Sequence, residues 1–234
     1  MIKFPETVKE IYVVGDLHGN LQFIKFKIKS LDLHDCLIII CGDVGLGFSP
    51  IVEMREINFI NKLLTKRNIY VAAIRGNHDD PKIFIDNSII YRNWLNVPDY
   101  TVLNVLNKNI LCVGGGTSID RKWRIANKIG YWPDEKVVYQ EKFDIPIHII
   151  CSHISPSFCY PLTKGPIVDY YAQEDPNLPL ELDEERLLMD KIFKDYSSTL
   201  THWYYGHYHA NYMEIIDNVK YTLLGCEKFA QHYE

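Results

Sequence analysis

The 234-residue sequence predicts an α/β fold with mixed β-sheet, organised as two sheets packed face to face. In the first half, strand-like apolar runs alternate with amphipathic helical stretches, a pattern typical of a parallel sheet with right-handed crossovers. In the second half, apolar runs come in pairs around short turns, which indicates antiparallel hairpins. Because no linker, repeat or low-complexity tract interrupts the chain, we expect a single domain over residues 1–234.

The first half is expected to supply three strands and two helices in alternation. The run CLIIIC at 36–41 is apolar on both faces, as expected of a strand buried inside a parallel sheet. The stretch IVEMREINFINKLLTK at 51–66 has apolar residues at helical spacing. The predicted order is strand 10–15, helix 21–31, strand 36–41, helix 51–66 and strand 68–74.

The second half is expected to be richer in strands. Two hairpins are predicted, one from 100–106 with 109–115 and one from 212–217 with 219–225. Two further strands are predicted at 147–152 and 202–206, and a helix with acidic residues in its first turn at 183–196. Residues 155–181 carry five of the eleven prolines and little periodicity. We therefore expect a long ordered loop there, lying over one face of the molecule.

Composition limits the partners and the compartment. Lys and Arg number 25 against 30 Asp and Glu, so the formal charge of −5 argues against coating nucleic acid through bulk positive charge. The six cysteines form no CxxC pair and mostly lie in or beside apolar runs, which favours reduced thiols. There is neither a signal-peptide pattern nor a run of 18 apolar residues. We expect a soluble, cytoplasmic protein without a membrane partner, and the oligomeric state stays open.

Polar clusters directly follow five of the predicted strands. They occupy residues 15–20, 42–43, 75–79, 152–153 and 206–209. In α/β sheets the binding crevice lies outside the carboxyl ends of the strands, so the clusters are expected to converge on one place. Asp16 and His18 are two residues apart, as are His207 and His209, so in extended backbone each pair faces one side.

The converging side chains are of metal-binding types. They comprise two Asp, one Asn and four His, without a thiolate. This is too many ligands for one tetrahedral zinc ion, but it suits two adjacent divalent ions that share a bridging carboxylate. Two ions about 3.5–4 Å apart bind both the attacking and the leaving oxygen of an in-line displacement at phosphorus. The ligand chemistry therefore favours metal-assisted hydrolysis of a phosphoester.

The order of these motifs resembles that of the calcineurin-like metallophosphoesterases. Asp-x-His, Gly-Asp, Gly-Asn-His-Asp, His and Gly-His-x-His follow one another between residues 15 and 209, each after a strand. The resemblance implies two mixed sheets packed face to face and flanked by helices. It also implies two divalent ions, of Mn, Fe or Zn. The first would be held by Asp16, His18 and His209, the second by Asn77, His153 and His207, with Asp43 bridging.

The resemblance also assigns catalytic roles. A hydroxide between the ions would attack phosphorus, His78 would act at the leaving-group oxygen, and Asp79 would orient its imidazole. The chain departs from the Ser/Thr protein phosphatases, which continue the second motif as Gly-Asp-x-x-Asp-Arg-Gly. Here residues 42–47 read GDVGLG, without that arginine. The pattern is closer to a small bacterial or phage-type phosphoesterase.

The substrate stays open between several classes. Arg75 is a candidate for binding the phosphate, as are Arg121 and Arg124 in residues 118–135, where basic and aromatic residues alternate. That stretch is either a solvated loop or helix, or a wall that would suit a nuclease or nucleotide phosphodiesterase. A phosphomonoesterase or phosphodiesterase acting on a phosphorylated small molecule, nucleotide or phosphoprotein is the first hypothesis. A catalytically silent scaffold is disfavoured because all seven ligands and His78 are present.

Overall fold

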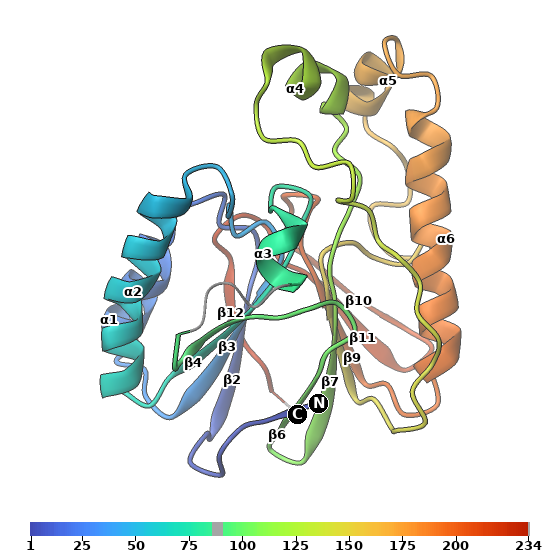
Figure 1. The fold of residues 1–234 in the computed structure, drawn as a ribbon. Helices are drawn as coiled ribbons and strands as arrows, with labels where there is room; N and C mark the ends of the chain where they lie inside the picture. Colours follow the sequence, from blue (N-terminus) through green and yellow to red (C-terminus); the bar gives the residue numbers. More distant parts are fainter. Residues whose placement is uncertain (86–90, 234) are drawn as a thin grey trace.

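The computed structural model describes residues 1–85 and 91–233 and confirms the predicted fold class (Figure 1). Two mixed sheets pack face to face, and helices cover their outer faces (Figure 1). In the described part of the chain, seven strands form one sheet in the order β1-β6-β7-β8-β9-β11-β10, and five form the other in the order β12-β2-β3-β4-β5.

The five-stranded sheet contains the predicted parallel unit. β2, β3, β4 and β5 run parallel, and β12 pairs antiparallel with β2. The elements of this half are β2 Glu10–Val14, α1 Gln22–Ser30, β3 Cys36–Cys41, α2 Pro50–Lys66, β4 Tyr70–Ile74, α3 Pro81–Ile85 and β5 Trp94–Asn96, with β12 Phe229–Gln231 joining from the far end of the chain. β1 Ile2–Lys3 precedes them in the sequence but pairs with β6 in the other sheet.

The seven-stranded sheet is built from two hairpins and a parallel centre. β7, β8, β9 and β11 run parallel, while β6 and β10 are antiparallel to β7 and β11 respectively. The elements are β6 Val102–Val105, β7 Lys108–Val113, α4 Arg121–Asn127, β8 Ile149–Ser152, α5 Pro166–Ala172, α6 Leu178–Tyr196, β9 His202–Tyr205, β10 Tyr212–Ile216 and β11 Val219–Leu223.

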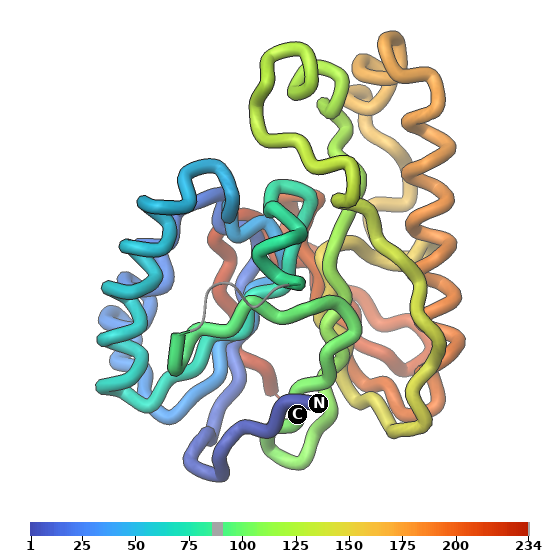
Figure 2. Tube along the Cα trace, in the orientation of Figure 1, coloured from blue at the N-terminus to red at the C-terminus, as the bar shows by residue number. Residues whose placement is uncertain are grey.

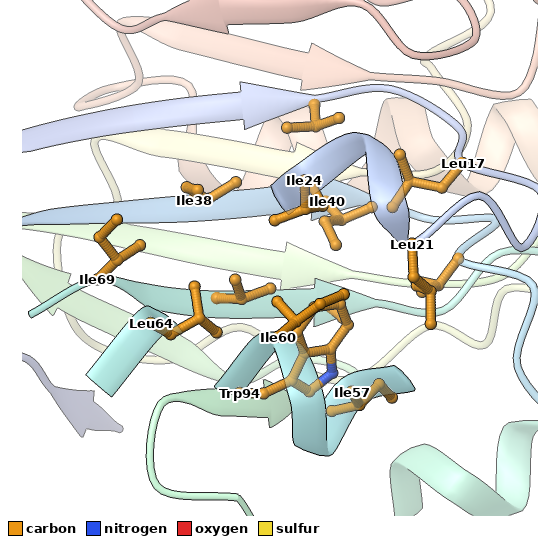
Figure 3. Packing of buried hydrophobic residues seen from close by; sticks show 14 of the residues in the cluster. Leu17, Leu21, Ile24, Ile38, Ile40, Ile57, Ile60, Leu64, Ile69 and Trp94 are labelled. Atoms are coloured by element: carbon orange, nitrogen blue, oxygen red, sulfur yellow. The ribbon is translucent and has the colours of Figure 1, made fainter. Parts of the chain in front are cut away.

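Strand β3 lies between two cores, which explains why it is apolar on both faces. Ile38 and Ile40 pack toward α1 and α2, where they meet Ile24 and Ile60 (Figure 3). The alternate residues, among them Ile39, face the other sheet. All six residues of β3 are buried. Such a strand is fixed in register from both sides, so the residue that follows it is held firmly.

The strand ends that matter for function lie at one end of the molecule. Register pairs Val14 with Ile40 and Cys41 with Ile74 in one sheet, and Cys151 with Tyr204 in the other. The segments carrying α4 and α5 stand above this same end, whereas the two chain termini lie at the opposite end (Figure 2). The loops after the central strands therefore share one edge, beneath α4 and α5.

The region predicted as a long loop is partly helical. Residues 155–181 contain α5, and α6 begins at Leu178 rather than at residue 183. Pro166 and Pro179 lie in the first turns of these helices. Proline is tolerated there because the first N–H groups of a helix have no intrahelical acceptor. The proline-rich composition thus marks helix starts as well as loop. In the described part of the chain no helix is both long and apolar enough to cross a bilayer.

Candidate metal centre

The structure brings the seven predicted ligands together at the shared edge of the two sheets. Four of them follow strands of the five-stranded sheet, including Asn77 after β4. The other three follow β8 and β9 of the seven-stranded sheet. Asp16 and His18 come after β2, Asp43 after β3, His153 after β8, and His207 and His209 after β9. The convergence predicted from strand ends is therefore observed, and it uses both sheets.

One group of ligand atoms from four residues lies close together. Asn77 Oδ1 lies 3.0 Å from His153 Nε2 and 3.0 Å from His207 Nδ1. The two nitrogens are 3.2 Å apart, and His153 Nε2 lies 3.3 Å from Asp43 Oδ1. Two ligands of one ion, each at about 2.1 Å, are separated by about 3.0–3.4 Å in octahedral or tetrahedral geometry. These atoms are therefore spaced as ligands of one divalent ion.

A second group lies on the other side of Asp43. His18 Nε2 and His209 Nε2 are 2.9 Å apart, and His209 Nε2 lies 3.2 Å from Asp16 Oδ2. Asp43 Oδ2 faces this group at 3.8 Å from His18 Nδ1, while Oδ1 faces the first group. Cys226, which was not predicted, brings its sulfur to within 4.8 Å of these ligand atoms. The sequence held a signal for it, since Cys226 also directly follows a predicted strand.

Backbone contacts hold the ligands in place. The N–H groups of Leu17 and His18 donate to the Asp43 carbonyl, and the N–H of His207 donates to the Asp16 carboxylate at 3.0 Å. His18, Asp43 and His207 adopt φ angles of 46°, 48° and 68°. Left-handed backbone is costly for residues with a side chain and is often found at functional sites, where the surrounding structure imposes it.

Further contacts select the ligand atoms. His153 Nδ1 donates to the Cys41 carbonyl at 2.9 Å, so Nε2 is the nitrogen that faces the other ligand atoms and would bind an ion on losing its proton. Asn77 Nδ2 donates to Ser118 Oγ at 3.0 Å, which turns Oδ1 toward the histidines. Ser118 in turn donates its hydroxyl and its N–H to the buried Glu135 carboxylate. Such partners are typical of metal sites, because they fix the orientation of each ligand.

Burial and neighbouring charges set the protonation states of the ligand groups. Burial opposes ionisation of Asp43, but the imidazoles of His153, His78 and His18 outweigh it and hold the pKa of this carboxyl well below its usual range. Burial lowers the pKa of His207, and the neighbouring His153 lowers it further, so this ring is neutral. Asp43 and Asp16 raise the pKa of His153 to about 9 against the effect of burial. Binding of an ion there would release a proton.

The family can be assigned at this point. Residues 9–211 match the family model described as calcineurin-like phosphoesterase. The chain belongs to the calcineurin-like phosphoesterase family. It is accordingly a hydrolase that acts on phosphoester bonds, in a family that uses divalent metal ions.

Several solved structures are similar to this phosphoesterase over most of its length. They include a phosphopantetheinyl hydrolase from Mycobacterium tuberculosis, at 13% identity over 97% of each chain with a TM-score of 0.46. An archaeal phosphodiesterase is 15% identical over 93% of this chain and 84% of its own, with a TM-score of 0.40. A putative 5′-nucleotidase from Staphylococcus aureus is 12% identical over 94% of this chain and 49% of its own, with a TM-score of 0.48. A comparison with curated protein sequences gives no match.

Asp79 lies elsewhere than its predicted role requires. Its carboxylate accepts hydrogen bonds from the backbone N–H groups of Gly76, Val44, Gly45 and Leu46, at 2.8–3.1 Å. The expectation that it orients the His78 imidazole is therefore wrong, because these amides occupy both of its oxygens. Asp79 instead ties the loop after β3 to the loop after β4, directly beneath Asp43.

Two of the three arginines predicted to bind phosphate form ion pairs within the protein instead. Arg75 is buried and donates to the Asp99 carboxylate at 2.7 Å and 3.0 Å and to the carbonyls of Glu135 and Lys136. Arg121 forms ion pairs with Asp175 and Glu181. Both guanidinium groups therefore have carboxylate partners within the protein that neutralise their charge, and neither lines the cleft. The structure therefore corrects both assignments to structural ion pairs.

Arg124 does reach the metal centre. Its Nη2 lies 2.9 Å from His78 Nδ1 and 3.2 Å from His78 Nε2. Asp120 and the Gly130 carbonyl hold the rest of the guanidinium at 2.7 Å and 3.0 Å. Helix α4 thus places one cation of the 118–135 stretch beside the predicted catalytic histidine.

The metal centre opens into a cleft with a volume of about 1240 Å³. Asp43, Asn77, His78 and His207 line its inner end, and residues 157–171 with part of α6 form its walls. The volume greatly exceeds that of a phosphate group, so the cleft has room for the rest of a substrate molecule.

Replacing Gly206 by alanine should weaken metal binding. A Cβ at this position would lie 2.2 Å from Asp16 Oδ1, so the carboxylate would have to move. We expect Gly206→Ala to lower the affinity for Mn²⁺ at least about tenfold, as is common when the support of a ligand is lost. Titration calorimetry on the chelator-treated protein measures this. Gly165→Ala is the control, because its Cβ would have nothing within 4 Å; equal affinity in the two variants would contradict the expectation.

Glu185 should make stability depend on pH. It is buried on α6 and accepts a hydrogen bond from Thr117 at 2.7 Å; burial raises its pKa from 4.5 to about 7. Between pH 4.5 and 7 the folded state therefore binds a proton that the unfolded state has lost, so the free energy of unfolding falls as the pH rises through this range. We expect Glu185→Gln to reduce this fall by about 2–3 kcal/mol in urea unfolding of the chelated protein. Parallel pH curves for wild type and variant would refute it.

Proposed function

We propose that this phosphoesterase acts through two divalent ions on a phosphorylated substrate that occupies the cleft. Asp16, His18 and His209 would hold the first ion, Asn77, His153 and His207 would hold the second, and Asp43 would be shared between them. The observation that carries the proposal is the position of Asp43, whose two carboxylate oxygens face separate groups of ligand atoms. Imidazole, carboxylate and amide ligands suit Mn, Fe or Zn.

The bound ions would supply a hydroxide nucleophile near neutral pH and neutralise charge on the phosphoryl oxygens. The chain itself positions these charges. Asp43 and Asp16 are buried, whereas His18 and His209 are exposed, and His209 lines the cleft together with Asp43, His78 and His207. A phosphate would therefore reach the centre from the cleft, past the His209 imidazole.

His78 and Arg124 are proposed to act on the substrate together. His78 lines the cleft, and its Nε2 lies 4.0 Å from Asp43 Oδ2. Burial lowers the pKa of His78, and the nearby guanidinium of Arg124 lowers it further, while Asp43 opposes both. Arg124 can donate to the unprotonated ring nitrogen, so that the other nitrogen keeps its proton for the leaving-group oxygen. The guanidinium also adds positive charge beside the transferred phosphoryl group.

A small phosphoester is favoured over a nucleic acid strand. The nuclease hypothesis depended on free arginines in residues 118–135, but Arg121 is paired with two carboxylates. Of the aromatic residues there, Trp132 packs edge to face against Phe48. A single-strand groove instead needs cations along its length with aromatic faces between them.

Metal removal and reconstitution test the two-ion proposal. We expect the chelated protein to lose hydrolysis of p-nitrophenyl phosphate or its bis ester, and Mn²⁺ to restore it with two ions bound per chain by elemental analysis. Asp43→Asn should lower kcat at least about 10²-fold, since loss of transition-state charge stabilisation typically costs 10²–10³-fold per group. The exposed Asp134→Asn is the control. Full activity with one ion per chain would overturn the proposal.

Arg124→Met tests the role of the cation beside His78. We expect kcat to fall about 10–10³-fold with a smaller change in KM, because the guanidinium acts on charge that grows in the transition state. The matched control is Lys122→Met on the same helix, whose side chain is exposed. If both variants keep wild-type kcat, Arg124 has no part in the reaction.

A further inference from the structure

The cleft beside the metal centre has an apolar wall. It is formed by side chains of the loop after β8, of α5 and of α6, namely Tyr160, Leu162, Ile167, Tyr171, Leu182 and Leu187. Three of these remain largely open to solvent, at 70% for Leu162, 54% for Ile167 and 58% for Leu187. Apolar side chains that stay exposed on one wall of a cleft gain from a ligand that covers them.

The cations in this part of the structure are already engaged. Of the lysine and arginine side chains that line the described cleft, Lys164 pairs with Asp183 and Arg186 donates to the carbonyls of Pro156, Pro161 and Cys159. Two carboxylates, those of Asp120 and Asp183, also line the cleft. A second phosphate on the substrate would meet negative charge without a free counterion, which is unfavourable in a partly buried cleft.

The wall is also held firmly in shape. Arg186, on α6, ties the segment 155–161 to the helix through the carbonyls described above and through Ser155 Oγ at 3.2 Å. The Tyr205 hydroxyl donates to the Tyr160 carbonyl at 2.9 Å, and the Tyr160 N–H donates to Glu214 at 2.8 Å. α5 and α6 pack together through Val168, Leu178 and Leu182. A preformed surface of this kind loses little entropy when a ligand binds.

We propose that the substrate carries a single phosphate and that its non-reacting part is uncharged and apolar, packed against Leu162, Ile167 and Leu187. The inference deepens the proposed function and rests on it for the position of the phosphate. The cleft volume of about 1240 Å³ is sufficient for such a group, since ligand pockets commonly measure about 300–1,000 Å³. Apolar contact area then determines which phosphoester is preferred.

Two phosphodiesters that differ only in apolar length test this directly. Methyl p-nitrophenyl phosphate and octyl p-nitrophenyl phosphate have the same charge and leaving group, and both are used below their micelle concentrations with the Mn²⁺-loaded protein. We expect kcat/KM to be at least about tenfold higher for the octyl ester, because each buried methylene contributes about fourfold. Equal values, or stronger inhibition by a thymidine oligonucleotide than by octylphosphonate, would overturn the inference.

Variants locate the effect on the wall. The double substitution Leu162→Ser with Ile167→Ser removes exposed side chains and should leave the fold intact. It should reduce the preference for the octyl ester, taken as the ratio of the two kcat/KM values, to about twofold or less. Leu180→Ser is the matched control, because Leu180 is 60% exposed and does not line the cleft. A preference that persists in the double variant would contradict the assignment of this wall.

Binding separates failure of the inference from failure of the proposed function. Methylphosphonate and octylphosphonate are titrated calorimetrically into the Mn²⁺-loaded wild type and the double variant. If octylphosphonate binds at least about tenfold more tightly than methylphosphonate to the wild type but not to the double variant, the apolar wall is supported. If neither ester is turned over in that case, only the proposed function fails. If both esters are turned over equally and both phosphonates bind equally, the proposed function stands and the apolar wall is refuted.

Discussion

The buried carboxylate of Asp43 is the constraint on which the arrangement of the other site residues depends. It follows a strand that is packed on both faces, and its own backbone is left-handed. Its carbonyl accepts the N–H groups of Leu17 and His18, and its Oδ1 accepts the N–H of His78. Gly76 approaches so closely that a Cβ there would lie 2.1 Å from the same oxygen. Three loops are thus built around one charge, which is worth burying only where cations compensate it.

The centre is also a junction between the two sheets. Asp16, Asp43 and Asn77 come from one sheet, and His153 and the two later histidines from the other. Direct hydrogen bonds cross the junction, from His153 Nδ1 to the Cys41 carbonyl and from the His207 N–H to Asp16. Ions bound by ligands from both sheets would therefore stabilise the packing of one sheet on the other, and metal affinity would be linked to folding stability.

The sequence was sufficient to predict the fold class and the convergence of the ligands, because both follow from strand ends, which are local patterns. The roles of Arg75, Asp79 and Arg121 depended on partners chosen by the tertiary structure. Asp99 is 24 residues from Arg75, and Glu181 is 60 residues from Arg121. No motif marks such pairs. The helical part of residues 155–181 was missed for a similar reason. Proline favours a loop in a sequence pattern, and it is compatible with a helix only in the first turn, whose position the sequence did not mark.

The charges of the site give a physical reason for the division between a polar inner end and an apolar wall. Two divalent ions with Asp16 and Asp43 would leave a net charge of about +2, and Arg124 adds one more. The phosphate of a monoester and the attacking hydroxide together carry about −3, which balances this positive charge. Two further carboxylates of the lining, Asp120 and Asp183, form ion pairs with Arg124 and Lys164. Beyond the first phosphate, binding energy is therefore available from apolar contact with the wall rather than from further charge.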